Sequence, residues 1–403
     1  MRAINLKTEH LIDPMGIDMA KPYLSWTCED GIVQTAYEIE AAADGSPWWN
    51  SGRVSGSQMH AFLERELPGR QRISWRVRLW DEEGGEGPWS EPAFFETGIL
   101  DKSHFQAKWI NPELICDPEI HKPASYLKKS FHAAKGKSAR LYITCHGLYE
   151  AYLNGKRVGD FALAPGCYNY DQRVAYQTYD VTDLIQDGEN LAEVILGDGW
   201  YRSVSGVDGD RNLYGADVAL FFQLEIDKKI VCISDENWTA SQSGPIREND
   251  MQQGEVIDAR MEEITDYHEV KVEDFGVETF CCANCMPIAE MEHFPGKLLR
   301  TPGGETVIDY GQNLAGYISF RLKAHAGQKI VLTHGETLDE NGNFTQENFQ
   351  DRKRHKEGGT RQQVVYTCKE GLNEYKARFT IWGFRYAKVE TDIDLQDAAF
   401  AAI

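Results

Sequence analysis

The feature that most constrains the fold is a hydrophobic alternation with a period of two residues. It recurs in short runs at 36–41, 73–80, 141–144, 151–153, 317–322 and 386–390. Each run turns one face of a strand toward a core and the other toward water. Turn signals separate the runs: Asp44-Gly45, Pro68-Gly69, Asn154-Gly155, Asp187-Gly188 and Asn341-Gly342. Stretches with a helical period are nearly absent, so the chain is predicted to be all-β, with stacked antiparallel sandwiches.

The length of the chain indicates its number of domains, and its charge argues against nucleic-acid and membrane partners. The chain has 403 residues, enough for two to three domains. Its formal net charge of −21 repels phosphate groups, so nucleic acid and anionic membranes are not expected partners. No apolar run is long enough to span a bilayer, and residues 1–16 lack the apolar core of a signal peptide. We therefore expect a cytoplasmic protein.

The nine cysteines are predicted to be free thiols. They are scattered along a long chain, and one cluster, Cys281-Cys282-Ala283-Asn284-Cys285, contains a CxxC spacing. A metal or redox site would need a second cysteine pair or a set of histidines downstream, and Cys368 stands alone. A structural role for the cluster is the favoured interpretation.

Composition divides the chain into three predicted sandwiches. Residues 1–99 have the length and strand pattern of a fibronectin type III-like domain. After a polar connector, a second sandwich is predicted over 108–290. A third is predicted over 295–395, following the Phe294-Pro295-Gly296 break.

One loop has side chains suited to sugar binding. In Gly197-Asp198-Gly199-Trp200-Tyr201, glycines flank a carboxylate and two aromatic rings follow. An aromatic ring stacks on the apolar face of a pyranose, and a carboxylate accepts hydrogen bonds from its hydroxyls. The alternative is a strand end with a buried tryptophan, and from the sequence alone this alternative is favoured.

A second loop has the oxygen spacing of a calcium site. Asp208, Asp210 and Asn212 match the first half of an EF-hand loop. Leu213 stands where that loop needs glycine, and no flanking helices are predicted. A solvated polar turn is the alternative and is favoured.

Glu255 and Asp258 are candidates for an acid/base pair. Two carboxylates three residues apart in an extended segment do not necessarily face each other. An ion pair between Asp258 or Glu255 and Arg260 is the favoured interpretation. The chain contains no G-x-S-x-G, H-E-x-x-H, P-loop or Rossmann glycine motif, and the sequence shows no defensible active site.

Together these motifs resemble the bacterial α-L-rhamnosidases of glycoside hydrolase family 78. The resemblance extends over nearly the whole chain, and the order and spacing of the segments make it specific. The segments are 24–26, 34–39, 75–81, 89–91, 149–150, 153–155, 158–160, 163–166, 176–182, 197–201, 254–260, 309–313, 316, 334–336, 379–380 and 383–386.

The resemblance implies a fold and a ligand. It implies a fibronectin type III-like sandwich, a jelly roll and a concanavalin-like sandwich in that order. In some members the jelly roll binds rhamnose with calcium. The candidate sugar-binding residues here are Asn169, Asp171, Asp198, Trp200 and Tyr201, and the candidate calcium ligands are Asp208, Asp210 and Asn212. A rhamnose-containing glycoside is the expected partner, no cofactor is required, and calcium is a candidate ion.

The resemblance also implies a part that this sequence does not contain. Family members continue into an (α/α)6 barrel, which carries the acid and base that hydrolyse terminal α-L-rhamnosides with inversion. No helical pattern of that kind begins here, so no catalytic residue is assigned and the chain alone is predicted to be inactive. Residues 396–403 are predicted to start the link to that barrel, with an exposed apolar end at Phe400–Ile403.

The chain is therefore expected to be the accessory N-terminal region of an α-L-rhamnosidase, with two roles: support of the barrel and binding of sugar in the jelly roll. The alternative is a free-standing carbohydrate-binding or adhesion-like module without a hydrolase partner. Such a module is expected to finish with a paired strand and a polar tail.

Overall fold

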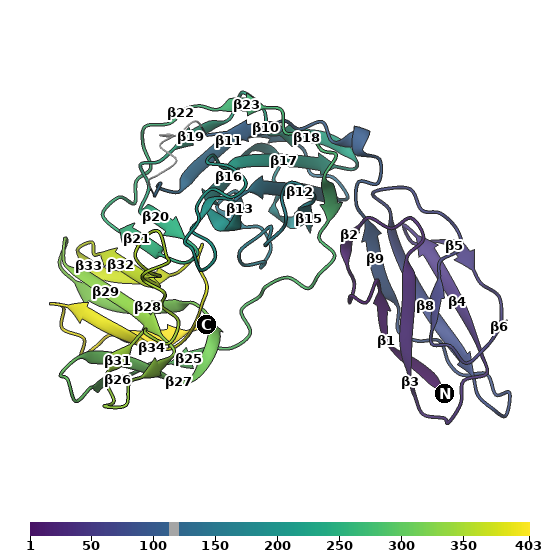
Figure 1. Cartoon of the computed structure of the whole chain (residues 1–403). Helices are drawn as coiled ribbons and strands as arrows, with labels where there is room; N and C mark the ends of the chain where they lie inside the picture. The colour runs from purple at the N-terminus through teal and green to yellow at the C-terminus, as the bar shows by residue number, and fades with distance from the viewer. Residues whose placement is uncertain (113–120) are drawn as a thin grey trace.

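The computed structural model describes residues 1–112 and 121–403, and Cys116 falls outside them. Three β-sandwiches follow one another along the chain and form an arch (Figure 1). The helical elements of the described residues are short: η1 (Lys102–His104), η2 (Thr182–Leu184) and α1 (Gly199–Arg202). None of these three helices of the described ranges is long and apolar enough to cross a membrane. The predicted all-β class with three sandwiches is confirmed.

The first domain packs two sheets around the alternating residues of its strands. On β8, for example, Trp75, Val77 and Leu79 are buried, whereas the residues between them point outward. One sheet has the order β1 (Arg2–Thr8), β3 (Tyr23–Glu29), β7 (His60–Phe62). The other has the order β2 (Met15–Ile17), β9 (Ala93–Thr97), β8 (Arg72–Trp80), β4 (Ala36–Ala43), β5 (Ser46–Asn50), with β6 (Val54–Ser55) beside β4.

The second domain is also a pair of sheets. One has the order β23 (Lys271–Glu273), β10 (Trp109–Asn111), β17 (Ala219–Ile226), β12 (Ala139–His146), β15 (Val174–Asp180), β24 (Phe280–Cys282), with β18 (Lys229–Ile233) beside β17. The other has the order β14 (Lys156–Arg157), β13 (Leu148–Leu153), β16 (Gly188–Gly197), β11 (Ser125–Ala133), β19 (Thr239–Ser241), β22 (His268–Glu269). The predicted turn at Asn154-Gly155 joins β13 to β14 with positive φ at both residues, which confirms it.

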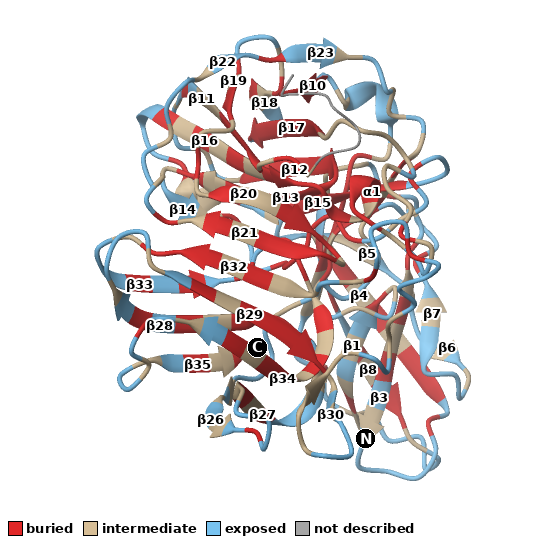
Figure 2. Cartoon of the chain, turned by 60° about the vertical axis from the view of Figure 1, so that its left-hand side comes forward, coloured by how far each residue is buried: buried red, intermediate tan, exposed pale blue. Residues whose placement is uncertain are grey.

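Two strands of the second domain are buried on both faces. Every residue of β12 and β17 is buried, and the same strands are buried along their length in Figure 2. Alternate residues such as Leu141 and Phe222 face the core between the two sheets, and the intervening Tyr142 and Phe221 face a second, aromatic cluster. We call this second cluster the aromatic layer; it consists chiefly of Trp109, Tyr142, His146, Tyr170, Tyr176, Tyr201, Tyr214, Phe221, Phe275 and Phe280.

The large sheet of the third domain includes a hairpin, β20 (Ile246–Asp250) and β21 (Gly254–Asp258), whose residues lie within the predicted second domain. This sheet has the order β20, β21, β32 (Gln363–Thr367), β29 (Lys329–Gly335), β34 (Trp382–Thr391), β27 (Thr306–Gly316), β26 (Lys297–Arg300). β21 runs parallel to β32 and pairs with it along its whole length. Figure 2 shows β20 and β21 continuing this sheet. The structure therefore places residues 246–258, within the predicted second domain 108–290, in the sheet of the third.

The smaller sheet of the third domain includes the last strand of the chain. Its order is β25 (Phe294–Pro295), β35 (Ala399–Ala402), β28 (Ile318–Ala324), β33 (Gly371–Lys376), and a separate hairpin joins β30 (Thr337–Leu338) and β31 (Phe344–Thr345). β35 is paired on both sides, and Phe400 and Ala402 are buried. The expectation of an exposed apolar end at Phe400–Ile403 is therefore wrong. The alternation of this segment matches a strand that completes the sheet.

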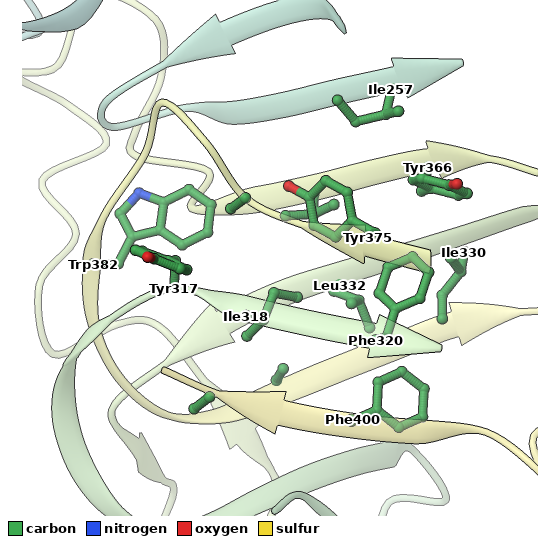
Figure 3. Close-up of a cluster of buried hydrophobic side chains, with 14 of the residues drawn as sticks. Ile257, Tyr317, Ile318, Phe320, Ile330, Leu332, Tyr366, Tyr375, Trp382 and Phe400 are labelled. Atoms are coloured by element: carbon green, nitrogen blue, oxygen red, sulfur yellow. The ribbon is translucent and has the colours of Figure 1, made fainter. Parts of the chain in front are cut away.

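The core of the third domain lies between its two sheets and includes residues of the β20–β21 hairpin. Figure 3 shows Phe320 and Phe400 from the smaller sheet beside Ile330 and Leu332 from the larger one, with Ile257 of β21 nearby. The same cluster contains second-domain residues, among them Tyr126, Leu148 and Leu163. The second and third domains therefore share one continuous hydrophobic core.

Candidate functional site

The predicted sugar loop begins where β16 ends and α1 starts. Asp198 is buried there, and its Oδ2 accepts a hydrogen bond from Arg202 Nη1 at 2.7 Å. The Arg202 side chain is fully buried and also donates through Nε to the Ala216 carbonyl at 2.8 Å. The four-residue spacing places the two side chains on one face of the helical turn, which explains why they pair.

Burial dominates the electrostatics of this pair. It raises the pKa of the Asp198 carboxyl to about 7, although the neighbouring Arg202 acts in the opposite direction. The cavity that both residues line has a volume of about 10 Å³, which is too small for a sugar. The geometry therefore gives Asp198 a structural role at the end of the strand, in line with the alternative interpretation of this loop.

Trp200 and Tyr201 point to different parts of the interior. Trp200 is half-buried and packs against the core shared with the third domain. Tyr201 is 6% exposed and stacks on the His146 ring, with a centroid distance of 4.6 Å and an interplanar angle of 9°. Burial raises the pKa of Tyr201 to about 12, and Asp217 and Asp171 add to this rise.

The predicted residues Asn169 and Asp171 lie at the exposed edge of the aromatic layer. They flank Tyr170, whose ring meets Tyr201 at 5.1 Å and Tyr214 at 5.1 Å. Both polar side chains are exposed, and the backbone turns tightly here because Gln172 and Arg173 donate N–H groups to the Asn169 carbonyl. The structure thus places Asn169, Asp171 and Tyr201 at the aromatic layer. Asp198 is buried with Arg202, and Trp200 packs against the core shared with the third domain.

The sequence analysis missed one polar residue of the aromatic layer. His146 is 7% exposed and lies between Trp109, at 4.4 Å, and Tyr201. Its Nδ1 has no hydrogen-bond partner in the part of the chain that the structure describes, and burial lowers its pKa to about 4. The only sequence signal for His146 was the alternation of β12, which places Tyr142, Thr144 and His146 on the same face of the strand.

The predicted calcium ligands contact the third domain. Asp208 forms an ion pair with Arg354, and Asp210 forms one with Lys356. The Asn212 backbone N–H donates to the Arg202 carbonyl at 3.0 Å. Within 1–112 and 121–403, no group of three or more acidic, histidine or cysteine side chains could hold a metal ion. Two of the three calcium candidates already have cationic partners, and calcium binding stays a prediction.

The other buried carboxylates are bound by internal donors. Glu255 accepts hydrogen bonds from Tyr375 Oη at 2.7 Å and from the backbone N–H groups of Arg378 and Phe379. The exposed Arg260 pairs with Asp258 at 2.7 Å, as the sequence analysis favoured. Glu255 thus ties β21 to β33 and the segment after it, whereas Asp258 is bonded by its close neighbour in the sequence; both are structural contacts.

The eight cysteines of the described ranges are free thiols, as expected. Cys281 receives a contact from Arg173 Nε at 2.9 Å, and Cys282 lies buried on β24. The contacts hold β24 beside β15, which is a structural use of the cluster.

Three family models match the chain in succession. They are a Rha78A-like N-terminal immunoglobulin domain at residues 3–101, an α-L-rhamnosidase N-terminal domain at 134–301, and a bacterial α-L-rhamnosidase concanavalin-like domain at 299–400. Their order is that of the three sandwiches in the structure.

Full-length relatives and solved structures agree with these matches. An α-L-rhamnosidase of Formosa agariphila is 31% identical over 94% of this chain and 45% of its own length. The crystal structure of an Aspergillus terreus α-L-rhamnosidase matches all of this chain and 49% of its own, with a TM-score of 0.90 and 29% identity. A Streptomyces avermitilis α-L-rhamnosidase solved with L-rhamnose shares the fold, at a TM-score of 0.86 and 23% identity, over all of this chain and 57% of its own. The chain spans about half the length of the curated relatives it matches.

Proposed function

The chain belongs to the N-terminal β-sandwich region of the bacterial α-L-rhamnosidase family, and on that premise we propose that it is the non-catalytic support of a rhamnoside hydrolase. The parent enzyme would hydrolyse terminal α-L-rhamnosides with inversion, through an acid and a base outside these residues. The region would hold that catalytic part and bind L-rhamnose weakly in its second domain.

The observation that carries the support role is the fusion of the second and third domains. β21 pairs with β32 by a parallel ladder, and the Trp382 indole donates to the Met251 carbonyl at 2.8 Å. Arg378 of the third domain pairs with Glu150 of the second at 2.8 Å. A body joined through a shared sheet and core resists relative motion of its parts. Rigidity of this kind suits a scaffold that must orient another domain.

The first domain is attached to this body through buried polar contacts. Glu96 accepts two hydrogen bonds from Arg140 at 2.7 and 2.9 Å, and Arg70 pairs with Glu225 at 3.2 Å. The Ile99 backbone N–H donates to Tyr176 Oη at 3.1 Å. These directional contacts orient the first domain on the second, and they extend the proposed scaffold to all three sandwiches.

The proposed rhamnose contact lies at the edge of the aromatic layer. Asn169 and Asp171 offer an amide and a carboxylate to sugar hydroxyls, near the half-buried ring of Tyr214. Tyr170 and Tyr201 are nearly buried, so their part is to hold the Tyr214 ring in place.

Two measurements test the proposal. The 403-residue chain is assayed with an aryl α-L-rhamnoside, and release of the aryl alcohol at the rate of the buffer blank is expected. The same chain is titrated calorimetrically with L-rhamnose, with and without calcium. Turnover would overturn the non-catalytic role. Heats that are flat in both conditions would overturn the sugar contact, and they would leave the support role standing.

A free-standing carbohydrate-binding module remains the alternative. An N169A/D171A variant tests whether any rhamnose heat comes from the proposed edge, with Asn5→Ala as an exposed control on the first domain. Binding without the edge residues would assign the sugar to another site.

A further inference from the structure

The outer face of the first domain contains a groove that the proposed function does not use. Its volume is about 860 Å³, within the range of about 300–1,000 Å³ typical of ligand pockets. It lies on the sheet that contains β4, β5 and β8, and the segment 88–92 forms one side. None of the rhamnose or calcium candidates named above lies in it.

Small side chains create the groove. Along the outward row of the sheet, Ala42 pairs with Ser74 on one side and with Pro47 on the other. The next outward row carries the longer Glu40 and Arg76, whose strand positions pair directly. The difference in side-chain length between adjacent rows leaves a depression across three strands.

Three tryptophans line this depression. Trp48, Trp49 and Trp89 are half-buried, so part of each ring is exposed to solvent. Their indole N–H groups have no acceptor in the part of the chain that the structure describes. By contrast, the indole N–H groups of five other tryptophans have internal acceptors: Trp26, Trp75, Trp109, Trp238 and Trp382. The groove thus offers both ring surface and unused donors.

Arginines hold two of these rings in position. The guanidinium carbons of Arg76 and Arg78 lie 4.6 and 4.8 Å from the Trp89 ring centroid. Arg65 lies 4.7 Å from the Trp48 ring and donates to the Trp48 carbonyl at 2.7 Å. Rings fixed in this way lose little conformational entropy when a ligand binds.

The charges of the groove favour a neutral ligand. Arg76 donates to Glu40 through Nε at 3.0 Å and Nη2 at 2.7 Å, and Arg2 pairs with Glu91 at 2.9 Å. Each charged group that lines the groove therefore has a partner of opposite sign. The chain as a whole carries −21, which disfavours anionic ligands. Planar carboxylate, guanidinium and amide groups remain available for hydrogen bonds to hydroxyls.

We propose that this groove binds a neutral oligosaccharide, with sugar rings stacked on Trp89 and Trp48 and hydroxyls bonded by Glu40, Arg76 and Asn50. Proline-rich peptides also dock in aromatic grooves, but they need few polar partners along their length. The paired planar groups beside the rings match a polyhydroxylated ligand better. The first domain would then anchor the protein on a polysaccharide, separately from the rhamnose edge of the second domain.

Affinity electrophoresis of the 403-residue chain tests the proposal. The gels contain xyloglucan, arabinan, galactan, mannan or an α-L-rhamnan, and retardation in at least one is expected. Trp89→Ala is expected to weaken that binding at least about tenfold, the loss typical of truncating a central aromatic anchor. Because this variant also removes the arginine contacts, Ser74→Gln provides a second test. It fills the floor of the groove from an exposed position and is expected to abolish retardation without unfolding the domain.

The control is Phe62→Ala, an aromatic residue 61% exposed on the opposite sheet of the same domain. It is expected to leave retardation unchanged. Equal effects of F62A and W89A, full binding by S74Q, displacement by decaproline, or no retardation in any gel would each overturn the proposal. Calorimetry of S74Q with L-rhamnose separates this site from the second-domain edge, because that titration should match the unaltered chain.

Discussion

The first domain and the fused second and third domains are stabilised in different ways. A hairpin that lies between second-domain strands along the chain, β20 and β21, belongs to the sheet of the third domain, and one core contains residues of both domains. Between the first and second, the contacts named above are mainly side-chain pairs such as Glu96 with Arg140. Three sandwiches of similar architecture therefore need not unfold as three independent units. We expect two unfolding units, the first domain and the fused body, and the predictions below test that division in order of decreasing effect.

Truncating a side chain at the fused boundary has the largest expected effect. Trp382 is 5% exposed and bonds across the boundary, so Trp382→Ala should destabilise the fused body by about 3–5 kcal/mol. Denaturant unfolding should show the second and third domains shifting together. The exposed Leu372→Ala is the control and should change stability by no more than about 0.5 kcal/mol. Separate transitions for the two domains would contradict the shared core.

Acid should weaken the fused body through a buried histidine. His146 has a pKa of about 4 when folded and its ordinary value of 6.5 when unfolded. The unfolded state therefore binds more protons between these values, so the stabilisation is present above pH 6.5 and is lost as the pH falls toward 4. The loss is about 3 kcal/mol at most. His146→Phe should reduce, without abolishing, this part of the pH dependence in thermal unfolding, because burial also lowers the pKa of His334 in the same body to about 4. Replacement of the exposed His325 by Gln should not, and an unchanged profile in H146F would exclude His146 as the cause.

The junction with the first domain should respond to loss of one buried charge. Glu96→Gln removes the more deeply buried of the two anions beside Arg140, the other being Asp180 at 2.9 Å, at a cost of about 1–3 kcal/mol. We expect the transition of the first domain to separate further from that of the body. Glu66→Gln, in an exposed pair with Lys21, is the matched control and should have little effect. A single transition that moves as a whole would argue for one unfolding unit instead of two.

The smallest stability effect is expected at the proposed rhamnose edge. Asn169 and Asp171 are exposed, so N169A/D171A should change stability by no more than about 0.5 kcal/mol. Any heat of binding with L-rhamnose should nevertheless disappear. A large loss of stability would show that these residues hold the turn around Tyr170 and do not serve a ligand.

Local features of the fold were predictable, because they depend on neighbours in the sequence. Alternation predicted the strands, Asn154-Gly155 predicted the hairpin, and the proximity of Arg260 to Glu255 and Asp258 predicted an ion pair, which the structure forms with Asp258. The partner of β21 was not predictable, because alternation shows which residues face inward and not which distant strand lies alongside. The same reasoning accounts for the wrong expectation at Phe400.

The candidate site was predicted less well than the fold. The sequence around Asp198 favoured a strand end over an exposed ligand group, but it did not identify Arg202 as the partner of the carboxylate. The position of His146 on the face of Tyr142 was a weak signal, because both faces of β12 are covered and a period of two cannot show this. The spacing of Asp208 and Asp210 suggested a cation, and the structure supplies Arg354 and Lys356 from far along the chain.

The hairpin of β20 and β21 has a consequence for how this protein can be dissected or recombined. If the gene were divided near residue 290, the first fragment would contain the β20–β21 hairpin without its neighbour β32. The second fragment would contain β32 with one edge unpaired. Unpaired edges of that kind invite intermolecular pairing and precipitation. The last two sandwiches would therefore have to be transferred together, whereas exchange of the first would have to preserve contacts such as that of Glu96 with Arg140.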